Sequence, residues 1–120
     1  MAYDTNNIFA RILRGEIPCK KVREDQHTLA FHDINPQTPT HILVIPKGEY
    51  VSMDDFTEKA SEAEIAALFR AVGTIAREAG VAESGYRILS NCGVDANQEV
   101  PHLHIHIFAG RPLGRMIGKG

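Results

Sequence analysis

The sequence is poor in cysteine, in net charge and in long apolar stretches. Its two cysteines, Cys19 and Cys92, lie far apart and lack the Cys-x-x-Cys spacing of zinc and redox motifs. Neither a disulfide framework nor a cysteine zinc site is indicated, and a reducing compartment is expected. The formal net charge is −2 with basic residues scattered along the chain, which argues against a nucleic-acid or membrane surface.

No apolar run approaches the ~18 residues that a membrane-spanning helix needs. The first residues also lack the basic and apolar regions of a signal peptide. We therefore expect a cytoplasmic protein with no membrane or nucleic-acid partner. A chain of 120 residues can form one hydrophobic core but not two, so we expect a single domain over residues 1–120 with an extended tail from about residue 109.

The most informative stretch is residues 101–108, where histidine occupies every second position from 102 to 106 and apolar residues fill the gaps. Strict period-two alternation predicts a β-strand. Such a strand places three imidazoles on one face and three aliphatic side chains in a core: His102, His104 and His106 against Leu103, Ile105 and Ile107.

Three interpretations fit this pattern. The face could be solvated, but a solvated face usually mixes residue types. The imidazoles could hold a zinc ion with an open position for water. They could also form a metal-free set in which one neutral imidazole attacks while its neighbours orient it and transfer protons.

The rest of the chain predicts an α+β domain around an antiparallel sheet. A first helix, capped by Asp4 or Thr5, ends at Gly15, and a longer helix runs from a capping box at Ser61 to Gly80. Residues 48–57 are turn-like, with Asp54-Asp55 suggesting a helical cap or a short turn. Strands are expected at residues 19–24, 27–33, 40–47, 85–91 and 101–108.

The polar loop over residues 92–99 leads directly into the histidine strand. Its backbone N–H groups and the amides of Asn91 and Gln98 can therefore lie beside His104. Backbone N–H groups near imidazoles favour an anion site, although a plain hairpin loop fits this segment equally well.

Two segments resemble a known family. The His-x-His-x-His pattern of residues 102–106 resembles the motif of the histidine triad (HIT) superfamily, and residues 31–47 (FHDINPQTPTHILVIPK) are similar to a signature of its nucleotide-binding (Hint) branch. Further similarity to bacterial Hint proteins lies at Ile8-Phe9, Asn91, Gln98-Glu99-Val100 and residues 110–114. The resemblance covers nearly the whole chain. It implies a HIT-like fold in which a five-stranded antiparallel sheet with two helices, ordered α-β-β-β-α-β-β, continues across a homodimer.

The resemblance also implies an activity, hydrolysis of the P–N bond in adenosine or guanosine 5′-monophosphoramidates without a metal or cofactor. Ligands would be purine nucleoside monophosphates such as AMP and GMP. His104 would be the nucleophile that forms a nucleotidyl-imidazole intermediate, and His106 would contact the phosphate and protonate the leaving amine. His102 and His41 would complete the hydrogen-bonded set. The resemblance assigns Asp33 to the ribose hydroxyls, a base pocket to Phe9, Ile12, Phe31, Ile34 and Leu43, and a phosphate loop to Asn91, Asn97, Gln98 and Glu99.

The sequence departs from the family at three places. Ala96-Asn97 replaces a frequent Gly-Gly, but asparagine tolerates the left-handed conformation, so the loop is expected to form. Pro101 stands where an aromatic residue is common, and Asn7 and Ala10 replace the zinc-binding cysteines of some members. Two other functions share the same residues: a dinucleoside polyphosphate hydrolase and a nucleotide-binding regulatory module without turnover.

Overall fold

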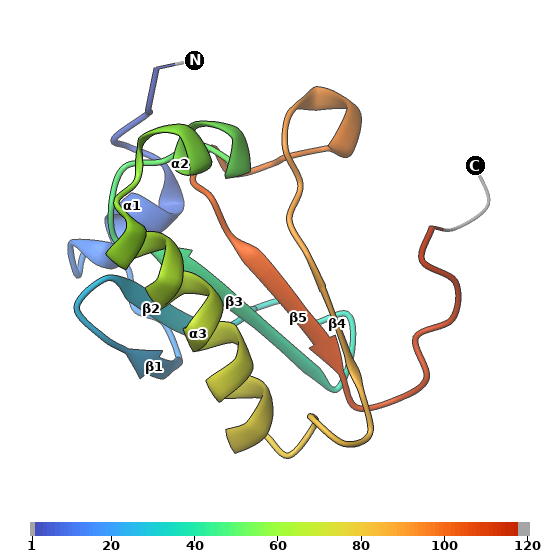
Figure 1. Ribbon diagram of the computed structural model, residues 1–120. Helices are drawn as coiled ribbons and strands as arrows, with labels where there is room; N and C mark the ends of the chain where they lie inside the picture. The colour runs from blue at the N-terminus through green and yellow to red at the C-terminus, as the bar shows by residue number, and fades with distance from the viewer. Residues whose placement is uncertain (1, 118–120) are drawn as a thin grey trace.

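The protein is built on a five-stranded antiparallel sheet, as predicted, in a computed structural model that describes residues 2–117 (Figure 1). The strand order is β1-β2-β3-β5-β4, and every neighbouring pair is antiparallel. None of the helices in the described range is long and apolar enough to cross a membrane. The elements along the chain are α1 (Ile8–Leu13), β1 (Lys21–Glu24), β2 (Thr28–His32), β3 (Thr40–Pro46), α2 (Met53–Lys59), α3 (Glu62–Glu78), β4 (Tyr86–Leu89), the 3₁₀ turn η1 (Val94–Ala96) and β5 (Ile105–Ala109).

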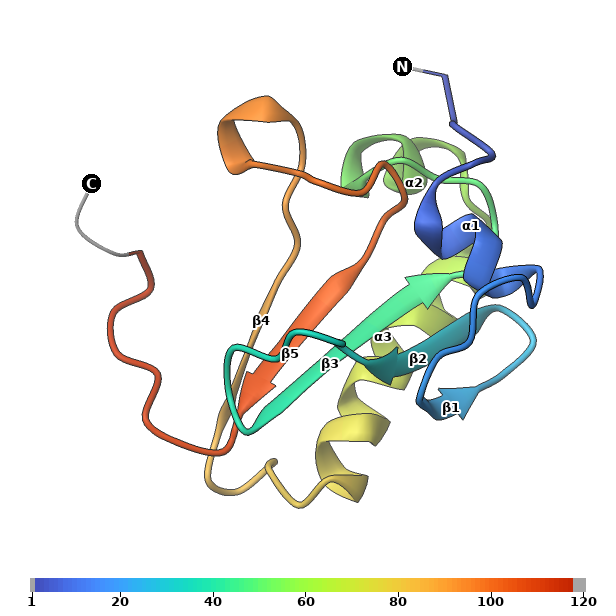
Figure 2. The same cartoon turned by 180° about the vertical axis from the view of Figure 1, so that it is seen from behind.

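Both faces of the sheet bury apolar side chains, each against a different helix. Helix α3 covers one face and closes the main core (Figure 1). On the opposite face α1 packs near one end, and no helix crosses β3 and β5 (Figure 2). Because successive residues of a strand point to opposite faces, β3 sends Ile42 and Val44 to the α3 side and Leu43 and Ile45 to the α1 side. This explains why β3 is apolar without interruption from Ile42 to Pro46.

Both predicted helices form, and one begins later than expected. Helix α3 starts with the predicted capping box, in which the Ser61 hydroxyl accepts from the Glu64 N–H at 3.1 Å and the Glu64 carboxylate accepts from the Ser61 N–H at 3.0 Å. The prediction that Asp4 or Thr5 caps α1 is wrong. The cap is Asn7, whose side-chain oxygen accepts from the Ala10 N–H at 2.9 Å.

Two segments differ from the sequence-based prediction. Part of the expected turn over residues 48–57 lies in helix α2, because Ser52 and Asp55 form a second capping box. The predicted strand over residues 101–108 is wrong at its start, since β5 begins only at Ile105. Before that point the Leu103 N–H donates to the Tyr50 carbonyl at 2.8 Å instead of joining the sheet. His102 and His104 therefore lie on an irregular segment.

Candidate active site

His102 is a buried support for the site and does not line it. Its side chain is 0% exposed, and its Nε2–H donates to the Pro46 carbonyl at 2.8 Å. The remaining ring nitrogen, Nδ1, accepts from the Tyr3 hydroxyl. Because both nitrogens of His102 are occupied, the three triad imidazoles cannot converge on one zinc ion. The zinc interpretation does not fit this geometry.

The backbone of His102 fixes the chemical form of His104. The carbonyl of His102 accepts a hydrogen bond of 2.7 Å from Nδ1 of His104. A carbonyl only accepts, so Nδ1 of His104 carries the proton, and in the neutral ring Nε2 carries a lone pair.

That lone pair opens into a cavity. Within residues 2–117, the single fully buried side-chain polar atom without a partner is Nε of Arg23. Nε2 of His104 also has no partner among these residues, and it is not one of the fully buried atoms. It is therefore accessible from the cavity that His104 lines, although the residue is only 7% exposed. The site thus presents an unprotonated imidazole nitrogen to whatever occupies this cavity.

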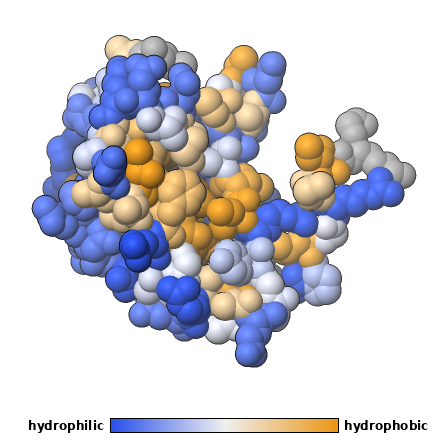
Figure 3. All heavy atoms as spheres, in the orientation of Figure 1, coloured by the Kyte–Doolittle hydropathy of each residue, from blue (hydrophilic) through white to orange (hydrophobic). Residues whose placement is uncertain are grey.

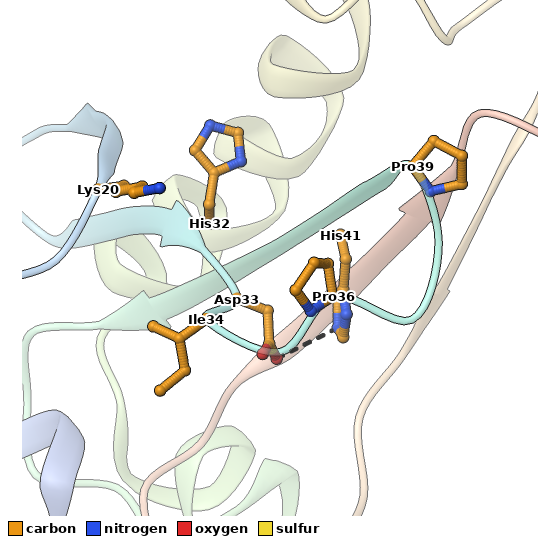
Figure 4. A pocket seen from close by; sticks show the side chains of 7 residues that line it. All are labelled: Lys20, His32, Asp33, Ile34, Pro36, Pro39 and His41. Carbon is orange, nitrogen blue, oxygen red and sulfur yellow. Dashed lines mark ion pairs between the residues drawn. The ribbon is translucent and has the colours of Figure 1, made fainter.

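His106 is linked to His41 and Asp33. The Gln37 N–H donates to Nδ1 of His41 at 3.2 Å, so the neutral ring of His41 carries its proton on Nε2. The Nε2 atom of His41 lies 2.9 Å from Nδ1 of His106, to which it donates, and 3.4 Å from a carboxylate oxygen of Asp33. Figure 4 shows the side chains of Asp33 and His41 pointing toward each other. Since Nδ1 of His106 accepts, the proton of its neutral ring is on Nε2.

Asp33, His41 and His106 are also close enough to be tested as a metal site, because their ligand atoms lie within 4.8 Å of one another. Ligation through Nε2 of His41 would require the proton to move to Nδ1. The Gln37 N–H already points at Nδ1, so two protons would then meet there. The donor set fits a hydrogen-bonded relay and does not fit a metal site.

Burial keeps all four imidazoles neutral near pH 7. It lowers the pKa of His102 to about 4, and burial together with the nearby His104 and His41 lowers the pKa of His106 to about 4. Burial also lowers the pKa of His104, and it lowers the pKa of His41 despite the opposing effect of Asp33. Each imidazole therefore has one lone-pair nitrogen and one N–H at physiological pH.

Two phenylalanines frame the imidazoles. The ring of Phe9 meets His104 edge to face with centroids 4.9 Å apart, and Phe108 stacks on His106 at 5.4 Å with an interplanar angle of 4°. These contacts restrict ring rotation, so the hydrogen bonds described above define single orientations of the two imidazoles.

Two adjoining cavities meet at Asp33. The polar one, of about 220 Å³, is lined by His104 and His106, and the apolar one, of about 270 Å³, lies against α1 and the start of β3. Asp33 lines both, and Ile34, which is 90% exposed, stands at the edge of the apolar cavity. The apolar cavity includes all five predicted base-pocket residues: Phe9, Ile12, Phe31, Ile34 and Leu43.

The structure divides the predicted phosphate loop. Asn91, Asn97 and Glu99 line the polar cavity with the two histidines. Gln98 does not, because its amide is used inside the loop: it donates to the Val51 carbonyl at 2.6 Å and accepts from the Gly93 N–H at 3.0 Å. Gln98 thus holds the loop to the segment before α2.

Asn97 adopts the conformation that the sequence predicted. Its φ of 56° and ψ of 48° are left-handed, and it is the one non-glycine residue with positive φ within residues 2–117. Asparagine reaches this region at lower cost than other non-glycine residues. The loop therefore closes after η1 without the glycines that are frequent at this place in the family.

Sequence reasoning missed three groups that hold the site. Tyr3 contacts His102 from 99 residues away, the Gln37 N–H sets the tautomer of His41, and the Ser90 hydroxyl donates to the His104 carbonyl at 2.9 Å. Gln37 lies inside the family-like segment, which was a signal for its position. A tyrosine in a polar N-terminal segment and a serine at a strand end gave none.

Comparison with known proteins agrees with this arrangement. The family model described as the HIT domain matches residues 14–113. A 13.2 kDa HIT-like protein of Azospirillum brasilense is 80% identical over 118 residues, which cover 98% of this chain and 97% of the relative. A purine nucleoside phosphoramidase of Escherichia coli K12 is 41% identical over 117 residues, with coverage of 98% and 96%.

A solved structure supports the fold directly. A HIT family hydrolase from Legionella pneumophila superposes with a TM-score of 0.87 at 39% identity, covering 94% of this chain and all of that one. The matched range includes Asp33, His41 and all three histidines of the triad. The chain belongs to the HIT domain family of histidine triad proteins.

Proposed function

We propose that this protein is a purine nucleoside phosphoramidase, which hydrolyses the P–N bond of adenosine and guanosine 5′-monophosphoramidates. The observation that carries the proposal is the unprotonated Nε2 of His104, held by the backbone of His102 in a polar cavity that adjoins an apolar one. The similarity to the E. coli phosphoramidase supports the same reaction class.

In the first step Nε2 of His104 attacks phosphorus and displaces the amine. A neutral imidazole needs no added base to attack, and the buried environment keeps His104 neutral. The products of this step are a nucleotidyl group bonded to Nε2 and an amine that must gain a proton as the P–N bond breaks.

His106 supplies that proton. An anionic phosphoryl group in the polar cavity raises the pKa of a neighbouring imidazole because it favours the charged form. His106, whose Nδ1 lies 2.9 Å from Nε2 of His41, therefore takes up a second proton from solvent when the substrate binds. As an imidazolium it transfers its Nε2 proton to the departing amine and becomes neutral. Such proton transfer contributes about 10²–10⁴ in rate.

Water completes the reaction. Neutral His106 accepts a proton from water as the oxygen attacks phosphorus, and the bond to Nε2 of His104 breaks. The nucleoside monophosphate is released, His104 regains its lone pair and His106 is again protonated. The loop that carries Asn91 and Asn97 stabilises the phosphoryl oxygens.

The apolar cavity accounts for the nucleoside part of the substrate. Phe9, Phe31 and Leu43 offer an apolar surface on which a purine can stack. Asp33 lies where this cavity meets the polar one, so its carboxylate can accept hydrogen bonds from ribose hydroxyls placed between base and phosphate.

Incubation with two substrates tests the proposal. Protein treated with a chelator is given adenosine 5′-phosphoramidate or, separately, diadenosine tetraphosphate, and AMP release is followed. We expect rapid release from the phosphoramidate and a loss of about 10³-fold or more in His104→Ala. His27→Ala, which removes a histidine that lines neither cavity, should retain full activity.

The other outcomes are equally informative. Preference for diadenosine tetraphosphate would assign the protein to dinucleoside polyphosphate hydrolases. Binding of AMP without turnover of either substrate would identify a nucleotide-binding module. Activity abolished by the chelator would contradict the metal-free mechanism.

We also propose that the protein is a homodimer whose sheet continues from one copy to the other. Strand β4 is at the edge of the sheet, so one side of its backbone is open to pairing. Beside it three large apolar side chains are exposed, Phe69 on α3 and Tyr86 and Ile88 on β4. Figure 3 shows hydrophobic side chains gathered between α3 and β4.

Sedimentation tests the dimer. The wild-type protein should sediment as a species of twice the 13.2 kDa chain mass at micromolar concentration. Ile88→Glu should dissociate it, because a charge would be buried in the interface. Val94→Glu, the same kind of change at an exposed residue of η1, should leave it intact. A monomeric wild type would contradict the proposal.

A further inference from the structure

Tyr3 joins the N-terminal segment to the buried member of the triad. Its hydroxyl donates to Nδ1 of His102, and its ring meets the imidazole edge to face with centroids 5.5 Å apart. Tyr3 lies before residue 14, where the match to the HIT domain begins. The residues that define the family in this chain therefore do not include it.

Tyr3 is held in place by the start of α1. The backbone N–H and the side-chain amide of Asn7 both donate to the Asp4 carbonyl, at 3.1 and 2.7 Å. A guanidinium nitrogen of Arg14 donates to the Thr5 carbonyl at 2.8 Å. Because Asn7 is also the cap of α1, the segment that carries Tyr3 has a fixed path across the site.

A hydrogen-bonded series leads from Tyr3 to the attacking nitrogen. Within residues 2–117 the Tyr3 hydroxyl is the only partner of Nδ1 of His102, while Nε2–H of His102 is bound to the Pro46 carbonyl. These two bonds fix the ring and with it the residue's backbone. The His102 carbonyl then holds Nδ1–H of His104 at 2.7 Å.

We propose that Tyr3 is a positioning residue, which through His102 fixes the orientation and tautomer of His104 for attack on phosphorus. This inference rests on the proposed phosphoramidase function. Tyr3 itself lines neither cavity and makes no contact with the place of the substrate. Its contribution should therefore appear in the chemical step and leave binding unchanged.

The pKa of His102 is consistent with this role. Burial lowers it to about 4, so Nδ1 keeps its lone pair for the Tyr3 hydroxyl at neutral pH. The other charged or titratable groups near this pair are His104 and Asp55 on the His102 side and Glu49, Arg14 and Asp4 on the Tyr3 side.

Tyr3→Phe tests the proposal because it keeps the ring and removes only the hydroxyl. We expect kcat for adenosine 5′-phosphoramidate to fall about 3- to 10-fold with KM and AMP affinity unchanged, the effect of losing one hydrogen bond that orients the nucleophile. In ¹⁵N NMR, the Nδ1 resonance of His102 should move toward that of a free lone-pair nitrogen.

Tyr50→Phe is the matched control. It removes the hydrogen bond of 2.8 Å between the Tyr50 hydroxyl and Glu64, which is partly buried but does not touch the triad. A purely structural role predicts that both variants lose stability alike and keep wild-type kcat. That result, or an unmoved His102 resonance, would overturn the proposal.

The two proposals can fail separately. A wild-type protein without phosphoramidase activity contradicts the proposed function, whereas the NMR measurement still decides whether Tyr3 orients His102. An active wild type with an equally active Tyr3→Phe variant contradicts only the positioning role.

Discussion

Each of the four imidazoles in the site has at least one ring nitrogen bound to a fixed partner. The partners are the Pro46 carbonyl for His102, the His102 carbonyl for His104, the Gln37 N–H for His41 and the Nε2–H of His41 for His106. These bonds decide which nitrogen has a proton. In the proposed mechanism they give four chemically identical side chains different roles: support, nucleophile, relay and proton donor.

Asp33 tests the proposed position of the nucleoside. Asp33→Ala should weaken AMP binding about 10-fold or more, because a charged acceptor of ribose hydroxyls is lost. The same substitution should not weaken binding of 2′,3′-dideoxy-AMP, which has no hydroxyl to donate. Calorimetric titration of both ligands measures the difference. Equal losses for the two would show that Asp33 acts elsewhere, for instance only on His41.

The prediction from sequence succeeded where apolar and polar residues alternate at regular spacing. The alternation of residues 102–107 correctly placed Leu103, Ile105 and Ile107 in the core. It could not show that His102 turns away from the cavity. That orientation depends on Pro46 and Tyr3, which are distant in the sequence and belong to elements that no local pattern connects.

At the scale of elements, the site is formed where regular structure ends. β5 begins just after His104, β2 ends just before Asp33, and η1 precedes Asn97. Helix α3 and the sheet were predictable because their apolar periodicity extends over many residues. Helix α2 and the late start of β5 were not, since a capping box at Ser52 and one hydrogen bond to Tyr50 decide them.

The loop conformation gives a prediction at this scale. If the loop binds phosphate through its backbone, Asn97→Gly should retain both the left-handed turn and the affinity for phosphate. Asn97→Ala should destabilise the loop by ~1–2 kcal/mol, the cost of the left-handed region for a residue with Cβ, and should weaken AMP binding correspondingly.

Urea unfolding and AMP titration of both Asn97 variants decide the matter. If glycine and alanine weaken AMP binding equally, the Asn97 side chain and not its backbone conformation contacts the ligand.

At the scale of the whole molecule, the two faces of the sheet differ, because one is a closed core and the other carries the cavities. The face under α3 is a closed core that includes Phe56, Leu68 and Ile107, each 0% exposed. The other face carries the two cavities, an apolar one between α1 and strands β2 and β3 and a polar one beside His104 and His106. The imidazoles are buried against this rigid layer, which lowers their pKa values.

Burial of neutral histidines makes stability depend on pH. The pKa values of His102 and His106 are about 4 in the folded protein, against about 6.5 for histidine in an unfolded chain. The unfolded chain therefore binds more protons between these values. The free energy of unfolding should be constant above pH 6.5 and should fall as the pH drops toward 4, on the order of 3 kcal/mol for the fully buried His102.

Urea unfolding from pH 4 to pH 8 measures this dependence. His102→Gln should reduce the slope between pH 6.5 and 4, because the variant has one fewer group to protonate on unfolding. A stability that is unchanged across this range in the wild type would mean that the histidines are not held neutral by burial.

The stereochemistry at phosphorus tests the central claim, attack by His104, most directly. A phosphoramidate made chiral at phosphorus with oxygen isotopes is hydrolysed by the wild-type protein in isotopically labelled water. Two successive in-line displacements, first by Nε2 of His104 and then by water, predict overall retention of configuration. Inversion would show a single direct attack by water and would contradict the covalent intermediate.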